Sequence, residues 1–313
     1  MSRPDLQALL EQAGIKASAG VPLKGRGYYK LGGPAEAFAS IERVEQLCQL
    51  MALGVPVTVI GRGSNLLIAD AGIPGVVIRL QGELRGREVL DGVLEVGAGV
   101  SNAPLLRWVA RHGLGGLACI AGVPGTIGGA VRMNAGWSAG EISSILIDAD
   151  VVLPGGELVT LSSEALAFSY RRSAGLPAGS VVTKARLSLL TDAAEVEAEQ
   201  ARIQHYLARR KATQPLDKPS CGSVFKNPPG DYAGRLIEAS GLKGHVIGGA
   251  QVSDVHANFI VNNGGTAGDV YALIRLVRRT VWARHGVLLA PEVHAVGAWP
   301  EGAWPLPHPE HDD

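Results

Sequence analysis

Hydrophobic residues recur at helical spacing in several segments of the chain. Leu47, Leu50 and Met51, for example, occupy positions i, i+3 and i+4 of one segment. This spacing places them on one face of a helix and predicts that the face is buried. Helices are predicted over residues 1–14, 44–54, 103–113, 193–211, 232–240 and 267–285.

Other segments carry runs of β-branched and apolar residues between glycine, proline and polar clusters, which is typical of strands. Strands are predicted over residues 36–40, 55–60, 75–80, 93–96, 145–153, 157–161, 180–189 and 257–261, and a last apolar segment covers 288–296. Helices and strands do not alternate regularly. The pattern therefore predicts an α+β fold rather than a doubly wound parallel sheet.

The composition changes at two places along the chain. From residues 191–194 onward the sequence becomes charged, alanine-rich and helical, which predicts a domain boundary there. Residues 299–313 are rich in proline, tryptophan and acidic residues and show no periodicity. We expect this last segment to be a flexible tail.

The charge balance limits the function classes. The chain has 313 residues, of which 29 are basic and 29 acidic, so its formal net charge is zero. Nucleic-acid-binding proteins usually show a broad positive field, which this balance does not supply. The 42 glycines, without a collagen repeat, indicate tight turns or backbone packed closely against a ligand.

The cysteines and the N-terminal sequence bear on the compartment. The three cysteines lie far apart and form no CxxC pair, which argues against a disulfide framework or a structural zinc site. The N-terminal segment lacks the apolar core of a signal peptide, and no apolar run is long enough to span a bilayer. We expect a cytoplasmic protein with no membrane insertion, no nucleic-acid partner and no obligate protein partner.

Two glycine-rich segments are candidate ligand loops. Residues 61–66 read Gly-Arg-Gly-Ser-Asn-Leu after a predicted strand, and residues 121–136 are also dense in glycine. Such segments let backbone N–H groups face an anion, and a helix start near Thr126 would aim further N–H groups at a pyrophosphate. Taken singly, the first segment is better explained as a tight turn, and an ordinary glycine-rich loop is the alternative for the second. Together they favour a dinucleotide cradle.

Four further segments carry side chains that could take part in catalysis or ligand binding. Ser223 has no neighbouring histidine and no GxSxG elbow, so a serine hydrolase is a poor interpretation. Arg171 could contact a carboxylate or phosphate with two N–H groups, although without further context a surface turn is the better explanation of its segment. Glu292 follows a proline at a strand start, where an exposed acid is common. His256 lacks the companions that a metal site needs, so we predict no metal.

The order of these motifs is more specific than any one of them. The succession KLGGPA, GRGSNLL, AGVPGTIGGAVRMNAG, FSYRRS, CGSVFKNP, GGAQVSDVHANFIVN and LAPEV resembles the UDP-N-acetylenolpyruvoylglucosamine reductase family from about Val21 to Gly297. CGSVFKNP and VPGTIGGAVRMNAG are its most specific parts.

The resemblance implies a fold and a reaction. The implied fold has a vanillyl-alcohol-oxidase-type (PCMH-type) FAD-binding region over 21–192, with subdomains at about 21–75 and 76–192, and a C-terminal α+β substrate domain over 193–298. A helix and lead-in over 1–20 would precede them. The implied enzyme holds FAD noncovalently and takes hydride from NADPH in a ping-pong cycle. It would reduce the enolpyruvyl ether of UDP-N-acetylglucosamine to UDP-N-acetylmuramate.

The resemblance also assigns residues. It implies that Arg171 and a protonated Glu292 polarise the substrate carboxylate and that Ser223, activated by Lys226 or a relay water, donates the proton. Contacts to substrate or its diphosphate are implied for Tyr170, Lys211, Asn227 and His256. Contacts to FAD are implied for Gly61, Arg62, Gly63, Ser64, Asn65, Leu66, Pro124, Gly125, Thr126, Gly128, Gly129 and Asn134.

The chain departs from the family pattern at two points. Trp137-Ser138-Ala139 stands where the family often has Ala-Tyr-Gly. This puts a tyrosine contact to the sugar nucleotide in doubt, unless Trp137 replaces it by stacking. The stretch between Leu189 and Lys211 is short and leaves no room for the tyrosine-bearing loop of one branch, so the chain is similar to the type II form.

Two alternative functions stay open at this level. An oxidase or dehydrogenase of the same fold would usually carry a histidine or cysteine for covalent FAD in the first glycine-rich region, and residues 61–67 contain neither. A flavin- or nucleotide-binding module without catalysis would not need an arginine, a serine and a glutamate in the family's positions.

Overall fold

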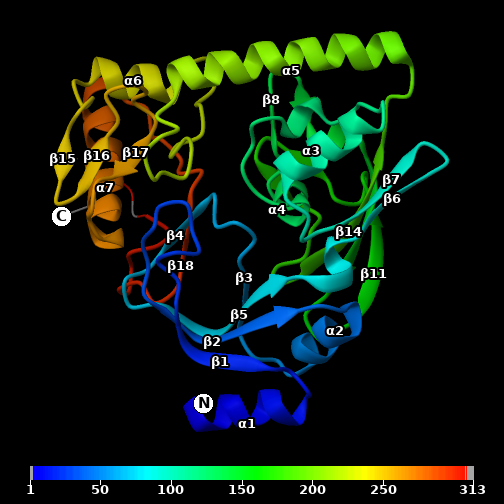
Figure 1. The fold of residues 1–313 in the computed structure, drawn as a ribbon. Helices are drawn as coiled ribbons and strands as arrows, with labels where there is room; N and C mark the ends of the chain where they lie inside the picture. The colour runs from blue at the N-terminus through cyan, green and yellow to red at the C-terminus, as the bar shows by residue number, and fades with distance from the viewer. Residues whose placement is uncertain (1–2, 307, 309–313) are drawn as a thin grey trace. The chain divides into compact units, whose positions relative to one another are not determined.

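The computed structural model describes residues 3–306 and 308, which form two compact units (Figure 1). The first unit contains the described residues up to Ala19 together with Ala37–Arg62 and Gly75–Arg210. The second contains Gly20–Glu36, Gly63–Pro74 and the described residues from Lys211 onward. These limits cross the linear division expected from the sequence, since two short early segments belong with the C-terminal unit.

The helices lie close to their predicted positions. They are α1 (Arg3–Gln12), α2 (Val44–Ala52), α3 (Asn102–Arg111), α4 (Ile127–Arg132), α5 (Ala193–Thr213), α6 (Ala233–Ala239) and α7 (Ala267–His285), with 3₁₀ turns η1 (Gly82–Arg85), η2 (Ala118–Ile120) and η3 (Ile142–Ser144). Their predicted faces are buried, as at Leu47 and Leu50 in α2 and at Leu105 and Val109 in α3. Helical periodicity therefore identified the core positions of these elements.

The strands are more numerous than predicted. They are β1 (Ala17–Pro22), β2 (Pro34–Ile41), β3 (Val57–Val59), β4 (Leu66–Ile68), β5 (Ile73–Leu80), β6 (Arg87–Leu90), β7 (Val93–Gly97), β8 (Gly136–Trp137), β9 (Gly140–Glu141), β10 (Leu146–Val152), β11 (Leu158–Ser162), β12 (Phe168–Ser169), β13 (Arg172–Ser173), β14 (Val181–Ser188), β15 (Val246–Ile247), β16 (Ala250–Val252), β17 (Ile260–Asn262) and β18 (His294–Val296). The segments predicted over 257–261 and 288–296 are strands only at their ends. The mixed content confirms the α+β class.

The first unit is built around an antiparallel sheet in the order β11-β10-β14-β7-β6. β10 pairs with β14 through Ala149 and Ala185, and both side chains are fully buried. A second sheet has the order β1-β2-β5-β3, in which β3 runs parallel to β5. One hydrophobic core joins residues of both sheets to α2, α3 and α4. This packing holds the glycine-rich segment around α4 against β7 and β14.

The second unit packs α6 and α7 with the small sheet β15-β16-β17. Thr266 and Asp269 form a capping box at the start of α7, and Gly286 ends the helix in the left-handed conformation with φ 65°. These two signals explain why the predicted limits 267–285 agree with the structure. β18 pairs in parallel with β4, so His294 lies opposite Leu66. This pairing brings the end of the LAPEV segment to the first glycine-rich loop.

Part of the segment expected to be a flexible tail contacts α7. The Tyr271 hydroxyl of α7 donates to Ala303 O at 3.0 Å, and the Trp299 ring lies 5.4 Å from the Tyr271 ring. Aromatic side chains bury a large apolar area even where the sequence shows no periodicity, and this area holds the segment on α7. The rest of the predicted tail, residue 307 and residues 309–313, lies outside the described residues. Among the described helices, none is long and apolar enough to cross a membrane.

Candidate functional site

The two glycine-rich segments approach each other within the first unit. A Cβ added at Gly61 would lie 2.7 Å from Thr126 Oγ1, so only glycine allows this approach. Ser101, just before α3, also forms a β-bridge with Thr126. The structure therefore brings Gly61, just after β3, beside the Pro124–Gly129 loop, which runs into the first turn of α4.

The Pro124–Gly129 loop presents an open face. Gly129 is exposed, and the nearest atom to a Cβ added there would be Thr126 Oγ1 at 3.8 Å, an ordinary contact distance. Its neighbour Gly128 is packed instead, because an added Cβ would lie 3.0 Å from the Ala98 Cβ. The loop thus has one side against the core and one bare backbone side. Such a surface fits a flat or phosphorylated ligand that must approach the backbone closely.

Arg171 lies in the tight turn between β12 and β13, next to Tyr170. Its φ of 57° is in the left-handed region, which costs a non-glycine residue on the order of 1–3 kcal/mol. Arg171 Nη2 donates to Gly136 O at 2.9 Å, and Nη1 lies 3.6 Å from Glu141 Oε1. The guanidinium carbon stands 4.9 Å from the centre of the Tyr170 ring. These contacts therefore hold the side chain in one orientation.

Asn134 connects this turn to the glycine-rich segment. Its Nδ2 donates to Glu141 Oε2 at 2.7 Å and to Ser169 O at 3.1 Å, and its Oδ1 accepts from Ser143 N at 3.2 Å. Asn134 is almost fully buried and has a φ of 41°. The sequence predicts that Asn134 contacts a cofactor. In the structure it ties the Arg171 turn to Glu141, a residue that the motifs did not single out.

Trp137 stacks on a residue of the same unit. Its ring lies 3.6 Å from the Tyr206 ring of α5 with an interplanar angle of 5°, and its Nε1 donates to Ala118 O at 2.7 Å. One face of the indole is therefore covered by Tyr206. A ligand can therefore stack on Trp137 only at the other face of the indole.

The segments that carry Ser223 and Glu292 lie side by side in the second unit. Glu292 N donates to Val224 O at 2.7 Å, Lys226 N donates to Ala290 O at 2.9 Å, and Phe225 forms a β-bridge with Pro291. Sequence neighbours of the serine are thus bonded to the glutamate and its neighbours. Two of the three predicted catalytic residues come together through backbone pairing.

Asn65 joins the first glycine-rich loop to this pair. Its Nδ2 donates to Glu292 O at 3.0 Å, while His294 N donates to Asn65 O at 3.0 Å. Within the same unit, Tyr28 N donates to Gly63 O at 3.1 Å. Gly63, Ser64, Asn65 and Leu66 therefore belong with the Glu292 segment, although they follow Gly61 and Arg62 directly in sequence.

Asn258 lies in the GGAQVSDVHANFIVN motif, which assigned it no role, and it is a structural residue of this site. It is buried, its Oδ1 accepts from Phe225 N at 3.0 Å, and its Nδ2 donates to Phe225 O at 2.8 Å. Its own carbonyl accepts from Val224 N at 2.8 Å. These three bonds fix the backbone on the C-terminal side of Ser223. The signal in the sequence was an asparagine in an apolar strand-like segment, where a buried amide needs partners.

The predicted substrate contacts of the second unit have different surroundings. Burial lowers the pKa of His256, whose Nδ1 accepts from Asn258 N at 3.2 Å. Its neutral ring therefore carries its proton on Nε2. Asn227 Oδ1 accepts from Ala233 N at 3.1 Å at the start of α6. Lys211 is exposed on α5. Nothing in these contacts assigns a ligand to the three residues, so their substrate roles stay predictions.

Cys221 precedes this segment and is buried. Burial raises its pKa to about 12, and its Sγ lies 3.4 Å from Leu66 O. A thiol with this pKa stays protonated near neutral pH and is a poor nucleophile. Cys221 therefore acts as a packing residue. No group of three or more potential metal ligands occurs among the described residues.

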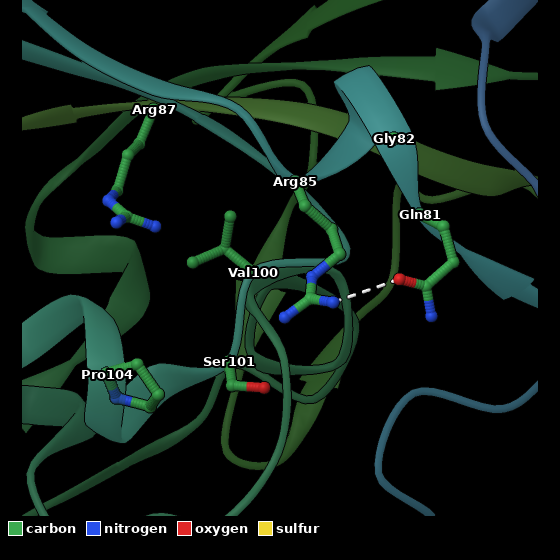
Figure 2. A pocket seen from close by; sticks show the side chains of 7 residues that line it. All are labelled: Gln81, Gly82, Arg85, Arg87, Val100, Ser101 and Pro104. Carbon is green, nitrogen blue, oxygen red and sulfur yellow. Dashed lines mark hydrogen bonds between the residues drawn. The ribbon is translucent and has the colours of Figure 1, made fainter.

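The first unit also contains a small cavity, lined in part by Ser101, which forms the β-bridge with Thr126 (Figure 2). Its volume is about 270 Å³, and Arg85 Nη1 donates to Gln81 Oε1 at 2.9 Å on its wall. Arg87 lines it as well and stands over the Trp108 ring. The lining residues are Gln81, Gly82, Arg85, Arg87, Val100, Ser101 and Pro104, and none of them is a predicted site residue.

Two family models match different parts of the chain. Residues 37–162 match the model of an FAD-binding domain, and residues 214–296 match the model of the C-terminal domain of UDP-N-acetylenolpyruvoylglucosamine reductase. A protein of that name from Anaeromyxobacter sp. (strain K) is 45% identical over 88% of this chain and 84% of its own length. One from Myxococcus xanthus is 43% identical over 91% of this chain and 93% of its own length.

A solved structure agrees with these sequence matches. The crystal structure of UDP-N-acetylenolpyruvylglucosamine reductase from Thermus caldophilus is 39% identical and superposes with a TM-score of 0.78. The match covers 90% of this chain and 99% of that one.

Proposed function

Because the chain belongs to the UDP-N-acetylenolpyruvoylglucosamine reductase family, we propose that Arg171, Ser223 and Glu292 carry out its chemistry. The enzyme is an FAD-dependent oxidoreductase, UDP-N-acetylmuramate dehydrogenase, with NADPH as the hydride donor. It reduces UDP-N-acetylenolpyruvoylglucosamine, a sugar nucleotide, in peptidoglycan precursor synthesis. FAD, held by Gly61 and residues 124–129, would supply the transfer of hydride from NADPH to the alkene of the substrate.

Hydride addition to the terminal carbon places negative charge on the adjacent carbon and its carboxylate. Arg171 stabilises this charge with its guanidinium, since a fixed cation near developing charge lowers the barrier. The bond to Gly136 O and the contact with Glu141 support this role, because they orient the side chain before substrate arrives. Glu292 carries a proton and donates a hydrogen bond to the same carboxylate, since an ionised carboxylate would repel it.

Ser223 completes the reduction by giving a proton to the carbanionic carbon. The observation that carries this proposal is the bonding of the Ser223 and Glu292 segments, through Glu292 N to Val224 O at 2.7 Å. The three bonds of Asn258 hold the same backbone still. A proton donor must be held within hydrogen-bond reach of the carbon that it protonates, and a rigid backbone supports this.

The test separates the two half-reactions of Ser223→Ala without oxygen. NADPH should bleach the flavin absorbance at the parent rate, because no proton from Ser223 enters that step. Recovery of absorbance on adding the enolpyruvyl sugar nucleotide should slow by about 10²–10⁴-fold, the usual contribution of a general acid. Ser220→Ala removes a hydroxyl from the same segment and should leave both rates unchanged. Recovery at the parent rate in Ser223→Ala would show that another group donates the proton.

We also propose that FAD is held without a covalent bond and that the enzyme works in the cytoplasm. The first glycine-rich loop contains no histidine or cysteine, the usual points of attachment. The cysteines are free thiols, which supports a reducing compartment. Acid precipitation tests the first point, because noncovalent flavin stays in the yellow supernatant.

A further inference from the structure

One face of α5 contacts the segment that leads into the Pro124–Gly129 loop. Glu199, Ile203, Tyr206 and Arg210 follow one another at a spacing of three or four residues and therefore share a helix face. Figure 1 shows α5 as the long helix with β8 close to it. The contacts of this face end at Gly122, two residues before the loop begins.

Glu199 makes the first of these contacts. It is 4% exposed although α5 is largely exposed. Its Oε2 accepts from Gly116 N at 2.8 Å and its Oε1 from Ala118 N at 2.9 Å. A buried carboxylate is costly unless both oxygens are satisfied, and here two backbone N–H groups satisfy them. The carboxylate therefore fixes the backbone of η2 in one position.

The middle of the face adds apolar and aromatic contacts. Ile203 packs with Ala118 and Ala121. The Tyr206 ring stacks on Trp137, whose Nε1 donates to Ala118 O. The N–H of Ala118 is thus held by Glu199 and its carbonyl by Trp137.

Arg210 makes the last contact of this face. Its Nη1 donates to Gly122 O, at the start of the glycine-rich run. Guanidinium hydrogen bonds are among the stronger ones in proteins. The carbonyl at the entrance of the loop is therefore tied to α5.

We propose that this face of α5 holds residues 116–122 in place and thereby positions the flavin-binding loop, with Glu199, Tyr206 and Arg210 as positioning residues. The inference rests on the proposed contact between FAD and residues 124–129. We call these contacts of Glu199, Tyr206 and Arg210 the clamp. A loop that is ordered before binding loses little conformational entropy when the ligand binds, so the clamp raises the affinity for FAD. None of the three residues needs to touch the cofactor.

Glu199→Gln tests the clamp with almost no change in volume. The amide oxygen can accept from one N–H, but the amide nitrogen cannot accept from the other, so one buried donor loses its partner. FAD titration of the full-length, flavin-stripped enzyme, followed by flavin fluorescence, should give a Kd at least tenfold higher than the parent's. Glu197→Gln removes the same charge from the exposed side of α5 and should change Kd less than twofold.

Tyr206 offers a second pair of variants if Glu199→Gln does not fold. Tyr206→Phe keeps the ring stacked on Trp137 and should bind FAD like the parent. Tyr206→Leu loses the stack and should raise Kd several-fold, with a far-ultraviolet circular dichroism spectrum like that of the parent. Equal Kd values for these two variants would overturn the role of the stack.

Gly129→Val distinguishes the inference from the proposal beneath it, because its side chain would stand on the open face of the loop. If Gly129→Val loses FAD and Glu199→Gln binds it with the parent's Kd, the clamp is refuted and the flavin contact stands. If both variants bind FAD normally, the flavin role of residues 124–129 is refuted and the clamp inference falls with it. Weak binding by both variants, with Glu197→Gln normal, supports the clamp.

Discussion

Replacement of Gly129 by alanine should stabilise the folded protein and weaken FAD binding at the same time. Gly129 lies inside α4, and the nearest atom to an added Cβ would be 3.8 Å away, so the methyl group fits the fold. Glycine in a helix costs about 0.5–1 kcal/mol relative to alanine, and the substitution should add that amount to the free energy of unfolding. The same methyl group stands where we propose that FAD meets bare backbone. A tenfold rise in Kd, about 1.4 kcal/mol, is expected.

Gly128→Ala is the matched control in the adjacent position. Its Cβ would lie 3.0 Å from the Ala98 Cβ and 3.3 Å from Ala98 O, so the core must shift to accept it. Overpacking of this kind typically costs about 1–3 kcal/mol, which exceeds the gain in helix propensity. Gly128→Ala should therefore lower the free energy of unfolding.

Two measurements on the flavin-stripped protein check this pair. Urea unfolding followed by circular dichroism gives the stability, and FAD titration followed by flavin fluorescence gives Kd. A stabilised Gly129→Ala protein that binds FAD like the parent would refute a flavin contact at this backbone. A destabilised Gly129→Ala protein would refute the open space that the structure shows beside Gly129.

Three other predictions follow from charges and burial. Glu141→Gln removes a charged partner of Arg171. Flavin reoxidation by substrate should therefore slow about tenfold, while bleaching by NADPH should not change. Equal effects on both half-reactions would contradict this prediction. Cys221, whose pKa burial raises to about 12, should resist iodoacetamide near neutral pH in the folded protein and react in denaturant, as mass spectrometry can show. Burial raises the pKa of Asp150, but hydrogen bonds from Arg186 and Thr160 outweigh it and lower the pKa overall. The pKa of Asp150 is therefore lower in the folded protein than in the unfolded chain, where it is about 4. The ionised carboxylate stabilises the fold above about pH 4, and this contribution is lost as the pH falls through the folded pKa. Asp150→Asn should therefore lower the free energy of unfolding, measured by urea titration, by about 1 kcal/mol at pH 7 and by less near pH 3. A difference that does not depend on pH would contradict a stabilising ion pair between Asp150 and Arg186.

The family and the reaction were accessible from the sequence because several motifs occur in a particular order. The periodic helices were also accessible, since a buried face repeats at the helical period. α7 is the clearest case, because a capping box and a C-terminal glycine mark both of its ends. The short strand β4 was missed. Its three residues carry too little pattern, and it exists only because it pairs with β18.

Sequence order could not predict which residues share a unit. Gly61 and Asn65 are four positions apart, yet one lies beside Thr126 and the other donates to Glu292 O. The roles of Glu141, Asn258 and Glu199 were equally hidden. Each acts through hydrogen bonds to groups distant in sequence, and no local spacing encodes such partners.

Local pattern thus determined the helices and the glycine-rich loops, and motif order singled out the candidate catalytic residues, because propensity, capping and motif spacing act between near neighbours. Tertiary structure alone decided how those residues are held. The Arg171 turn is oriented by Glu141 and Gly136, and the backbone after Ser223 is fixed by Asn258. Burial makes the contacts of Asn258 obligatory, and burial is a property of the folded chain.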